Sequence, residues 1–336
     1  MRRRYKGLLV ATAVLAVAIA AGPRVHLHPL ILSALPQAMP QTPEALQAWV
    51  DAGERAVSGL RPDNQARVVW ADPAHPARTS CAIVYLHGFG ASQGEGAPVH
   101  RQLAHAFGCN LYLSRLPGHG LVAADAMRGL DAQHLLQGAA QALAIGHVLG
   151  NKVIVIGTST GGALALDLAA RQPKQVDALV LWSPLVRERG NGLAPMLWPW
   201  GPSWLRYVKN HGGTIVHGRS DSVYWAADTH MDGYRSLTEL TRGEMQPATF
   251  ARVIAPVFLG YYYRDEQHQD PTVSVAAMLA MYDRLGTPPT FKRKQDFPDA
   301  GAHVIASPLR SQASAAVFAA SRDFLQQVVG LVPVEH

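Results

Sequence analysis

The chain lacks the sequence signatures of several common functional classes. Only two of its 336 residues are cysteine, and neither cysteine has a second metal-type ligand nearby at the spacing of a zinc site. Two glycine patterns that bind phosphate, Gly-x-x-x-x-Gly-Lys-Ser/Thr and Gly-x-Gly-x-x-Gly, are missing. Internal repeats and long low-complexity runs are missing as well. These absences give no signal of a zinc site at the cysteines or of a phosphate-binding loop.

Acidic residues are missing from the first part of the chain. No Asp or Glu precedes Glu44, whereas Arg2, Arg3, Arg4, Lys6 and Arg24 are all basic. These five residues account for most of the formal net charge of +6, so the remainder of the chain is close to neutral. Binding of nucleic acid requires basic residues clustered on the folded domain, and a nucleic-acid partner is therefore not expected.

A long uncharged run is also limited to one place. Gly7 to Ala21 contains no charged residue, follows the basic start, and ends in Ala18-Ile19-Ala20, which has the layout of a secretory signal with a small-residue cleavage site. The run is slightly short for a membrane-spanning helix, although Gly22 and Pro23 extend it. Residues 1–24 are predicted to be a signal peptide or an N-terminal membrane anchor. The protein is accordingly expected to be exported: periplasmic, secreted, or anchored to the inner membrane.

The two cysteines, Cys81 and Cys109, each begin an apolar run with strand character. If the two strands are neighbours in a sheet and the compartment is oxidising, a disulfide is geometrically feasible. Two buried free thiols are the alternative.

Apolar strand-like runs alternate with helical stretches along most of the chain. Residues 25–64 read as a proline-rich connector followed by an amphipathic helix. Strands are predicted at 67–71, 81–86, 110–114, 152–156, 178–182, 256–262 and 289–294, and helices at 43–60, 98–107, 131–149, 161–171, 273–285 and 307–328. Such alternation predicts a mainly parallel sheet covered by helices on both faces.

One stretch interrupts this alternation. Residues 184–249 contain four tryptophans and several prolines without a regular strand and helix rhythm. We interpret them as a cap that is inserted after the sixth strand and covers the carboxyl edge of the sheet, where ligands of open α/β sheets bind. The core domain is then formed by residues 65–183 and 250–336.

The most informative motif lies at residues 152–171. A β-branched apolar run leads into Gly157-Thr158-Ser159-Thr160-Gly161, and a stretch rich in Ala and Leu follows. This order of strand, sharp turn and helix is that of a nucleophile elbow, in which Ser159 projects beyond the sheet. Strand and helix cross closely there, so the flanking residues must be small, as Gly157 and Gly161 are.

A serine nucleophile needs a base and an acid that orients the base. In folds with this elbow the acid follows the serine in the chain and the histidine follows the acid. His303 comes after the strand-like residues 289–294 and is the predicted base. Asp270 begins a turn that leads into a helix and is the preferred acid, and Asp265, which is nearer the end of the strand at 256–262, is the alternative.

The oxyanion of the reaction needs two preorganised N–H donors. One is the backbone N–H of Thr160, the residue after the nucleophile. The other is assigned to Phe89, in a loop where Gly88 and a second glycine allow the backbone to turn inward after a buried strand. His87 is interpreted as structural, with its ring bonded to the backbone of this loop.

These motifs together resemble the α/β-hydrolase superfamily over about residues 65–330. The segments that carry the resemblance are Tyr85-Leu-His-Gly-Phe-Gly90, Arg115-Leu-Pro-Gly-His-Gly120, Gly157-Thr-Ser-Thr-Gly161, Asp270, and Gly301-Ala-His303. The chain looks most like exported bacterial serine esterases and lipases, including monoacylglycerol-lipase-like members with a cap. The resemblance implies that the serine, the acid and the histidine form a catalytic triad and that no metal or cofactor is used.

The expected function is therefore hydrolysis of carboxylic esters, with a small-molecule or lipid ester as substrate and an acyl-enzyme as intermediate. Thioesterases, acyltransferases and peptidases use the same set of residues and remain alternatives. A non-catalytic, membrane-tethered binding protein of the same fold is a further alternative, because a fold by itself does not guarantee activity.

Overall fold

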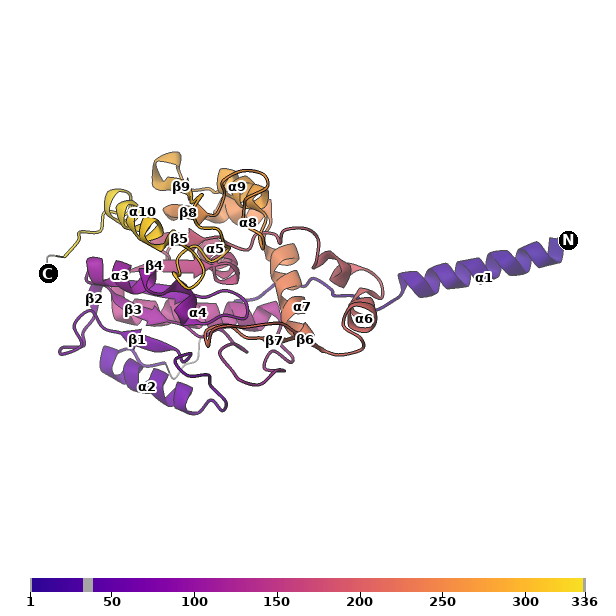
Figure 1. Ribbon diagram of the computed structural model, residues 1–336, viewed down its shortest axis with the longest axis horizontal. Helices are drawn as coiled ribbons and strands as arrows, with labels where there is room; N and C mark the ends of the chain where they lie inside the picture. The colour runs from indigo at the N-terminus through magenta and orange to yellow at the C-terminus, as the bar shows by residue number, and fades with distance from the viewer. Residues whose placement is uncertain (1, 33–38, 335–336) are drawn as a thin grey trace.

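The central feature of the computed structural model is a sheet of seven strands in the order β1-β3-β2-β4-β5-β8-β9 (Figure 1). The structure describes residues 2–32 and 39–334, with the backbone alone for residues 2–4, 7 and 8. All neighbouring strands are parallel except the edge pair of β1 and β3, which is antiparallel. The strands are β1 (Arg67–Val69), β2 (Thr79–Leu86), β3 (Asn110–Leu113), β4 (Gly150–Thr158), β5 (Ala178–Trp182), β8 (Val257–Tyr261) and β9 (Lys292–Asp296).

Helices cover both faces of this sheet, as the alternating pattern predicts. The helices are α2 (Pro43–Arg55), α3 (Val99–Ala106), α4 (Ala132–Leu149), α5 (Thr160–Arg171), α8 (Pro247–Arg252), α9 (Val275–Arg284) and α10 (Ser314–Gln327). Helices α3 and α10 pack on one face, and α4, α5 and α9 pack on the other. The side chains of β2 alternate between the two faces of the sheet. Ile83 and Tyr85 pack in the core beside α3 and α10, and Ala82, Val84 and Leu86 pack in the core beside α4, α5 and α9.

Three elements differ from the sequence prediction by more than two residues at one end. The helix predicted at 43–60 ends at Arg55, and Gly59 then adopts a left-handed conformation with φ of 70°, which no helix continues through. The last strand begins at Lys292, because Pro289 opens a short 3-10 turn. The last helix begins at Ser314, because Ser307 to Ser311 form a hydrogen-bonded turn first.

The tryptophan-rich insertion follows β5, which is the fifth strand of the described chain and not the sixth. The five strands predicted before residue 184 are all present, so the word sixth in the prediction was a miscount. The insertion contains short helical turns, a small hairpin and one longer helix: η2 (Ala194–Leu197), α6 (Gly201–Trp204), η3 (Leu205–Lys209), β6 (Ile215–His217), β7 (Asp228–His230), α7 (Met231–Glu239) and η4 (Leu240–Glu244). Its domain limits at 184 and 249 stay a prediction.

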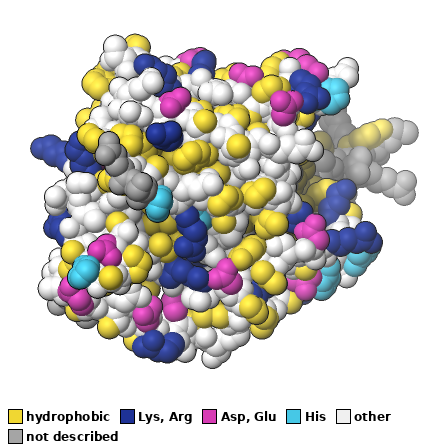
Figure 2. All heavy atoms as spheres, turned by 60° about the vertical axis from the view of Figure 1, so that its left-hand side comes forward, with side chains coloured by type: hydrophobic (Ala, Val, Ile, Leu, Met, Phe, Trp, Pro, Cys, Tyr) yellow, Lys and Arg dark blue, Asp and Glu magenta, His cyan; other side chains and the backbone are white. Residues whose placement is uncertain are grey.

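Helix α1 (Arg2–Ala20) projects away from the body at the end where α6 lies (Figure 1). Several of its apolar side chains are exposed, among them Leu9, Val14 and Val17. None of the described helices combines the length and the apolar character required to cross a membrane. The body itself shows basic and acidic side chains interspersed with apolar ones on the face drawn in Figure 2.

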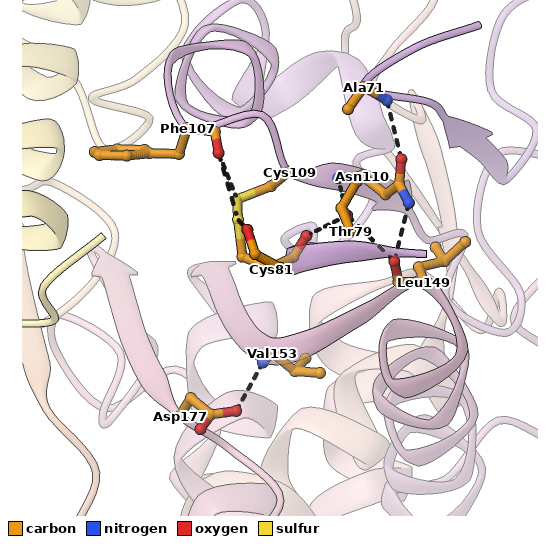
Figure 3. Close-up of a disulfide and its surroundings, with 10 residues drawn as sticks. Ala71, Thr79, Cys81, Phe107, Cys109, Asn110, Leu149, Val153 and Asp177 are labelled. Carbon is orange, nitrogen blue, oxygen red and sulfur yellow. Dashed lines mark hydrogen bonds between the residues drawn. A yellow bond between two sulfur atoms is a disulfide. The ribbon is translucent and has the colours of Figure 1, made fainter. Parts of the chain in front are cut away.

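The two cysteines form a disulfide between β2 and the residue that precedes β3. The Cα atoms of Cys81 and Cys109 are 4.8 Å apart, within the range that a disulfide spans. Figure 3 shows the bond beside Asn110, whose side chain accepts from Ala71 N at 2.9 Å and donates to Leu149 O at 2.9 Å. The structure therefore favours the disulfide over the two free thiols that the sequence left open.

Candidate active site

Ser159 lies at the sharp turn between β4 and α5, where the motif placed it. Its backbone has φ of 52° and ψ of −116°, a conformation that costs energy for any residue with a side chain. The flanking residues must be glycine because there is no room for a side chain at either position. A Cβ atom on Gly161 would lie 2.0 Å from Leu86 O, and one on Gly157 would lie 2.6 Å from the carbonyl carbon of Gly161. The serine is 6% exposed, so it is reached only through a cavity.

His303 lies beside Asp270, which follows β8. The Nδ1 atom of His303 is 2.7 Å from Asp270 Oδ2, and the other carboxylate oxygen accepts from Thr272 N at 2.8 Å and Val273 N at 2.9 Å. Burial raises the pKa of Asp270, but the charge and hydrogen bond of His303 and these two N–H donors outweigh it and lower the pKa. Burial lowers the pKa of His303, and the charge and hydrogen bond of Asp270, followed by the charge of Glu95, raise it overall.

Asp265 is directed elsewhere. Its Oδ1 atom accepts from Gln267 N at 2.9 Å and from His268 N at 2.8 Å, and it lies 2.9 Å from the ring of His268. Its side chain is 52% exposed. The structure therefore brings Asp270, and not Asp265, to His303.

Ser159 and His303 line one cavity of about 480 Å³. His303 Nε2 is buried there and has no hydrogen-bond partner among the described residues. Phe89 and Thr160, the two predicted oxyanion donors, line the same cavity. The first turn of α5 leaves backbone N–H groups without intrahelical acceptors, and Thr160 is the first residue of that turn.

The insertion supplies much of the apolar wall of this cavity through Leu193, Trp225, Tyr234 and Leu237. A second cavity of about 270 Å³ extends beneath the insertion and shares Gly192, Leu193 and Tyr234 with the first. A larger hollow of about 590 Å³ beside α3 and α10 contains none of the predicted site residues.

His87 has the structural bonding that the sequence analysis expects. Its Nδ1 atom is 2.9 Å from Gly88 O, and its Nε2 atom accepts from Leu116 N at 3.0 Å. A carbonyl acceptor at one nitrogen and an N–H donor at the other define a neutral ring. Burial also lowers the pKa of His87 to about 3, so the ring is no base for Ser159.

Sequence reasoning missed Glu95, which lies in the wall of the same cavity. This carboxylate is 3% exposed. A signal was present in the sequence, because Glu95 is the only Asp, Glu, Lys or Arg between Arg78 and Arg101. A lone charge in an otherwise uncharged loop beside a buried strand points to a buried, hydrogen-bonded carboxylate.

Metal chemistry has no candidate cluster in the described part of the chain, where no group of three His, Cys, Asp or Glu side chains is arranged to hold an ion. The chemistry that the cavity offers is that of a hydroxyl at an elbow, an imidazole bonded to a carboxylate, and backbone N–H groups at a helix start.

Comparison with known proteins identifies the family to which the chain belongs. The model of the alpha/beta hydrolase family matches residues 83–320. One of the lipolytic enzymes LipS and LipT, which derive from a metagenome, has a similar solved structure, with 16% identity, a TM-score of 0.64, and coverage of 80% of this chain and 99% of that one.

Two further structures share the fold. A monoacylglycerol lipase of Paleococcus ferrophilus has 16% identity and a TM-score of 0.55, with 78% of this chain and 98% of that one covered. A monoglyceride lipase of Saccharomyces cerevisiae has 12% identity and a TM-score of 0.57, with 78% and 91% covered. A search among curated proteins found no significant match. Because the family model spans more than half of the residues, the chain belongs to the alpha/beta hydrolase family.

Proposed function

We propose that the protein is a serine hydrolase that cleaves carboxylic esters through an acyl-enzyme. The observation that carries this proposal is the geometry of His303. One ring nitrogen is bonded to buried Asp270, and the other is buried and unpartnered, among the described residues, in the cavity that Ser159 lines. A base oriented in this way, next to a serine at an elbow, is the arrangement that activates a hydroxyl nucleophile.

In the proposed reaction, Ser159 Oγ attacks the ester carbonyl and His303 Nε2 takes the serine proton. The N–H groups of Phe89 and Thr160 stabilise the oxyanion, and Asp270 stabilises the imidazolium. His303 then gives the proton to the leaving alcohol as the ester bond breaks. Water, deprotonated by His303, attacks the acyl-enzyme and releases the acid, and Ser159 regains its proton.

The cavity supports an apolar acyl or alcohol group in the substrate. Its wall carries Leu193, Trp225 and Tyr234, and a second cavity continues from it beneath the insertion. The names of the similar lipases are consistent with a lipid ester, although those likenesses support the fold alone. Thioesters and amides are the other acyl compounds that the same residues would process.

We further propose that the protein is exported and associates with a membrane surface through its N-terminal segment. The disulfide supports an oxidising compartment. Exposed apolar side chains of α1 support lipid contact, as do Trp198 and Trp200, which are 56% and 49% exposed on the insertion. Trp200 Nε1 donates to Ala18 O at 3.1 Å, so the two surfaces adjoin.

The proposed function is tested with a series of p-nitrophenyl esters from acetate to palmitate. The wild type is expected to hydrolyse them, and Ser159→Ala to lose activity by at least about a thousandfold. A fluorophosphonate probe should label the wild type and leave Ser159→Ala unlabelled. Thr158→Ser, one residue away, keeps a hydroxyl and serves as the control that remains labelled. A folded wild type that neither labels nor turns over any ester, thioester or amide would favour the binding protein.

A further inference from the structure

Glu95 is a buried carboxylate next to the nucleophile that the reaction described above does not use. It lies on the 3-10 turn η1 (Gln93–Gly96), in the connection between β2 and α3. Among the described residues, no Lys or Arg lies within ion-pair distance of Glu95. Burying a carboxylate without a cationic partner costs free energy unless hydrogen bonds compensate for the loss of water. The hydrogen-bond partners of Glu95 therefore indicate its role.

The hydrogen bonds of Glu95 connect the oxyanion loop to the nucleophile elbow. Its Oε2 atom accepts from Gly88 N at 2.6 Å and from the Tyr85 hydroxyl at 3.2 Å. The Tyr85 hydroxyl also lies 3.0 Å from Thr158 Oγ1. Gly88 precedes the expected oxyanion donor Phe89, and Thr158 precedes Ser159. Glu95 therefore holds the oxyanion loop directly and the elbow through Tyr85, and the relative position of these two segments defines the oxyanion hole.

Gly88 lies close to both Glu95 and Ser159, and a side chain at this position would meet both of them. A Cβ atom on Gly88 would lie 2.7 Å from Glu95 Oε1 and 3.1 Å from Ser159 Cβ. The carboxylate and the nucleophile thus approach Gly88 from the same side. This contact explains why the loop needs glycine at position 88, where the backbone φ itself is not in the left-handed region.

The charge of Glu95 also acts on His303. Burial raises the pKa of Glu95, and the Gly88 N–H, the charge of His303, and hydrogen bonds from Tyr85 and Trp225 offset this only in part, so the pKa stays above the ordinary value of a glutamate. The other charged residues of the cavity wall are engaged elsewhere: Glu188 pairs with Arg242, and Arg189 donates to the carbonyl groups of Gln269 and Asp270. His303 therefore has two carboxylates acting on it, Asp270 through a direct hydrogen bond and Glu95 through space.

We propose that Glu95 is a positioning residue of this site, which fixes the oxyanion loop against the elbow and supplies a second negative charge that stabilises the imidazolium of His303. The inference rests on the proposed serine hydrolase function. As Ser159 attacks, His303 gains a proton and a positive charge, and both carboxylates favour that charge. The same charge holds His303 protonated up to a higher pH in the free enzyme, where only the neutral ring is an active base.

The test is the pH dependence of labelling of Ser159 by a fluorophosphonate, which needs no knowledge of the substrate. Labelling by the wild type should rise with pH as His303 loses its proton. Glu95→Gln keeps an oxygen that accepts from Gly88 N but removes the charge, so the rise should move to lower pH by roughly half a unit to one unit. Glu95→Ala removes the acceptor as well and should also lower the plateau rate by about tenfold or more.

Glu239→Gln is the matched control. Glu239 is a partly buried glutamate that, like Glu95, accepts from a backbone N–H, that of Ala132 at 2.9 Å, but it does not line the cavity. The pH profile of this control variant should coincide with that of the wild type.

If Glu95 had a purely structural role, its substitutions would lower the plateau rate and leave the pH of the rise unchanged. That outcome would overturn the proposal.

The pH profile of the wild type is itself a test, and it does not depend on whether the variants fold. A rise centred at or below the ordinary histidine pKa of about 6.5 would also overturn the proposal. A wild type that is not labelled at any pH would instead reject the proposed hydrolase function, so the two failures are distinguishable.

Discussion

At the scale of the residue, the choice between two neighbouring aspartates depends on their hydrogen bonds. Asp270 is fully buried and receives two backbone N–H groups and the His303 ring. Asp265 is exposed, and the hydrogen bonds of its carboxylate stay within its own loop. Only the first arrangement fixes the orientation of an imidazole, because the carboxylate that holds the ring is itself held.

This difference predicts different outcomes for two equivalent substitutions. Asp270→Asn should lower kcat for ester hydrolysis by roughly 10⁴-fold, since the neutral amide neither orients His303 in the active tautomer nor stabilises its charge. Asp265→Asn should change kcat by less than about threefold. Steady-state kinetics on the most reactive p-nitrophenyl ester measures both. Equal losses in the two variants would show that the acid is wrongly assigned.

At the scale of the element, β2 shows how local pattern and tertiary contact combine. Its alternating side chains reach both cores, its first half carries Cys81, and the loop after its end provides Gly88 and Phe89. The parallel pairing of β2 with β3 brings Ala82 opposite Asn110, so the cysteines that precede these residues are also adjacent. The disulfide thus follows from the register of two strands.

The disulfide predicts a measurable contribution to stability. The two cysteines are 28 residues apart in sequence, and closing a loop of that size stabilises the folded state by about 3 to 4 kcal/mol in the chain-entropy model. The double variant Cys81→Ser, Cys109→Ser should lose about that much free energy of unfolding in urea. Reduced wild type is the control, and it should match the variant. Equal stability of oxidised and reduced wild type would contradict the prediction.

At the scale of the whole molecule, many of the exposed apolar side chains belong to α1 and the insertion. Helix α1 projects from the end of the body where α6 lies (Figure 1). Trp198, Trp200 and Trp204 of the insertion are all more than one third exposed, and Arg206 and Lys209 lie among them with their charges over Tyr207 and Trp204. Indole rings and basic side chains together are typical of a surface that contacts lipid headgroups.

This surface predicts binding to anionic phospholipid vesicles. The full chain should sediment with vesicles that contain phosphatidylglycerol, and Trp198→Ser with Trp204→Ser should reduce the bound fraction severalfold. Phe291→Ser removes an aromatic side chain that is 44% exposed and lies outside the insertion, so it should leave binding unchanged. Equal binding by all three proteins would refute a role of the insertion in lipid contact.

Several parts of the fold were predictable from the sequence because they depend on local chemistry. The elbow required an apolar β-branched run, small residues around Ser159 and a helix rich in Ala and Leu, and all of these are neighbours in the chain. The ends of the last strand and helix were predicted less well. Pro289 and the turn at Ser307 move the start of the strand from 289 to 292 and the start of the helix from 307 to 314. Hydrophobic periodicity does not detect such changes, because the turn residues fit the same apolar pattern.

The sequence by itself determined the alternation of strands and helices, the order of serine, acid and histidine, and the place of the insertion between core strands, because each follows from residue period and chain order. Only the tertiary structure decided that Asp270 and not Asp265 reaches His303, that Cys81 and Cys109 are joined, and that Glu95 lies beside the nucleophile. The physical reason is that a hydrogen bond or a disulfide requires atoms within a few ångströms, and the path of loops in space sets that distance.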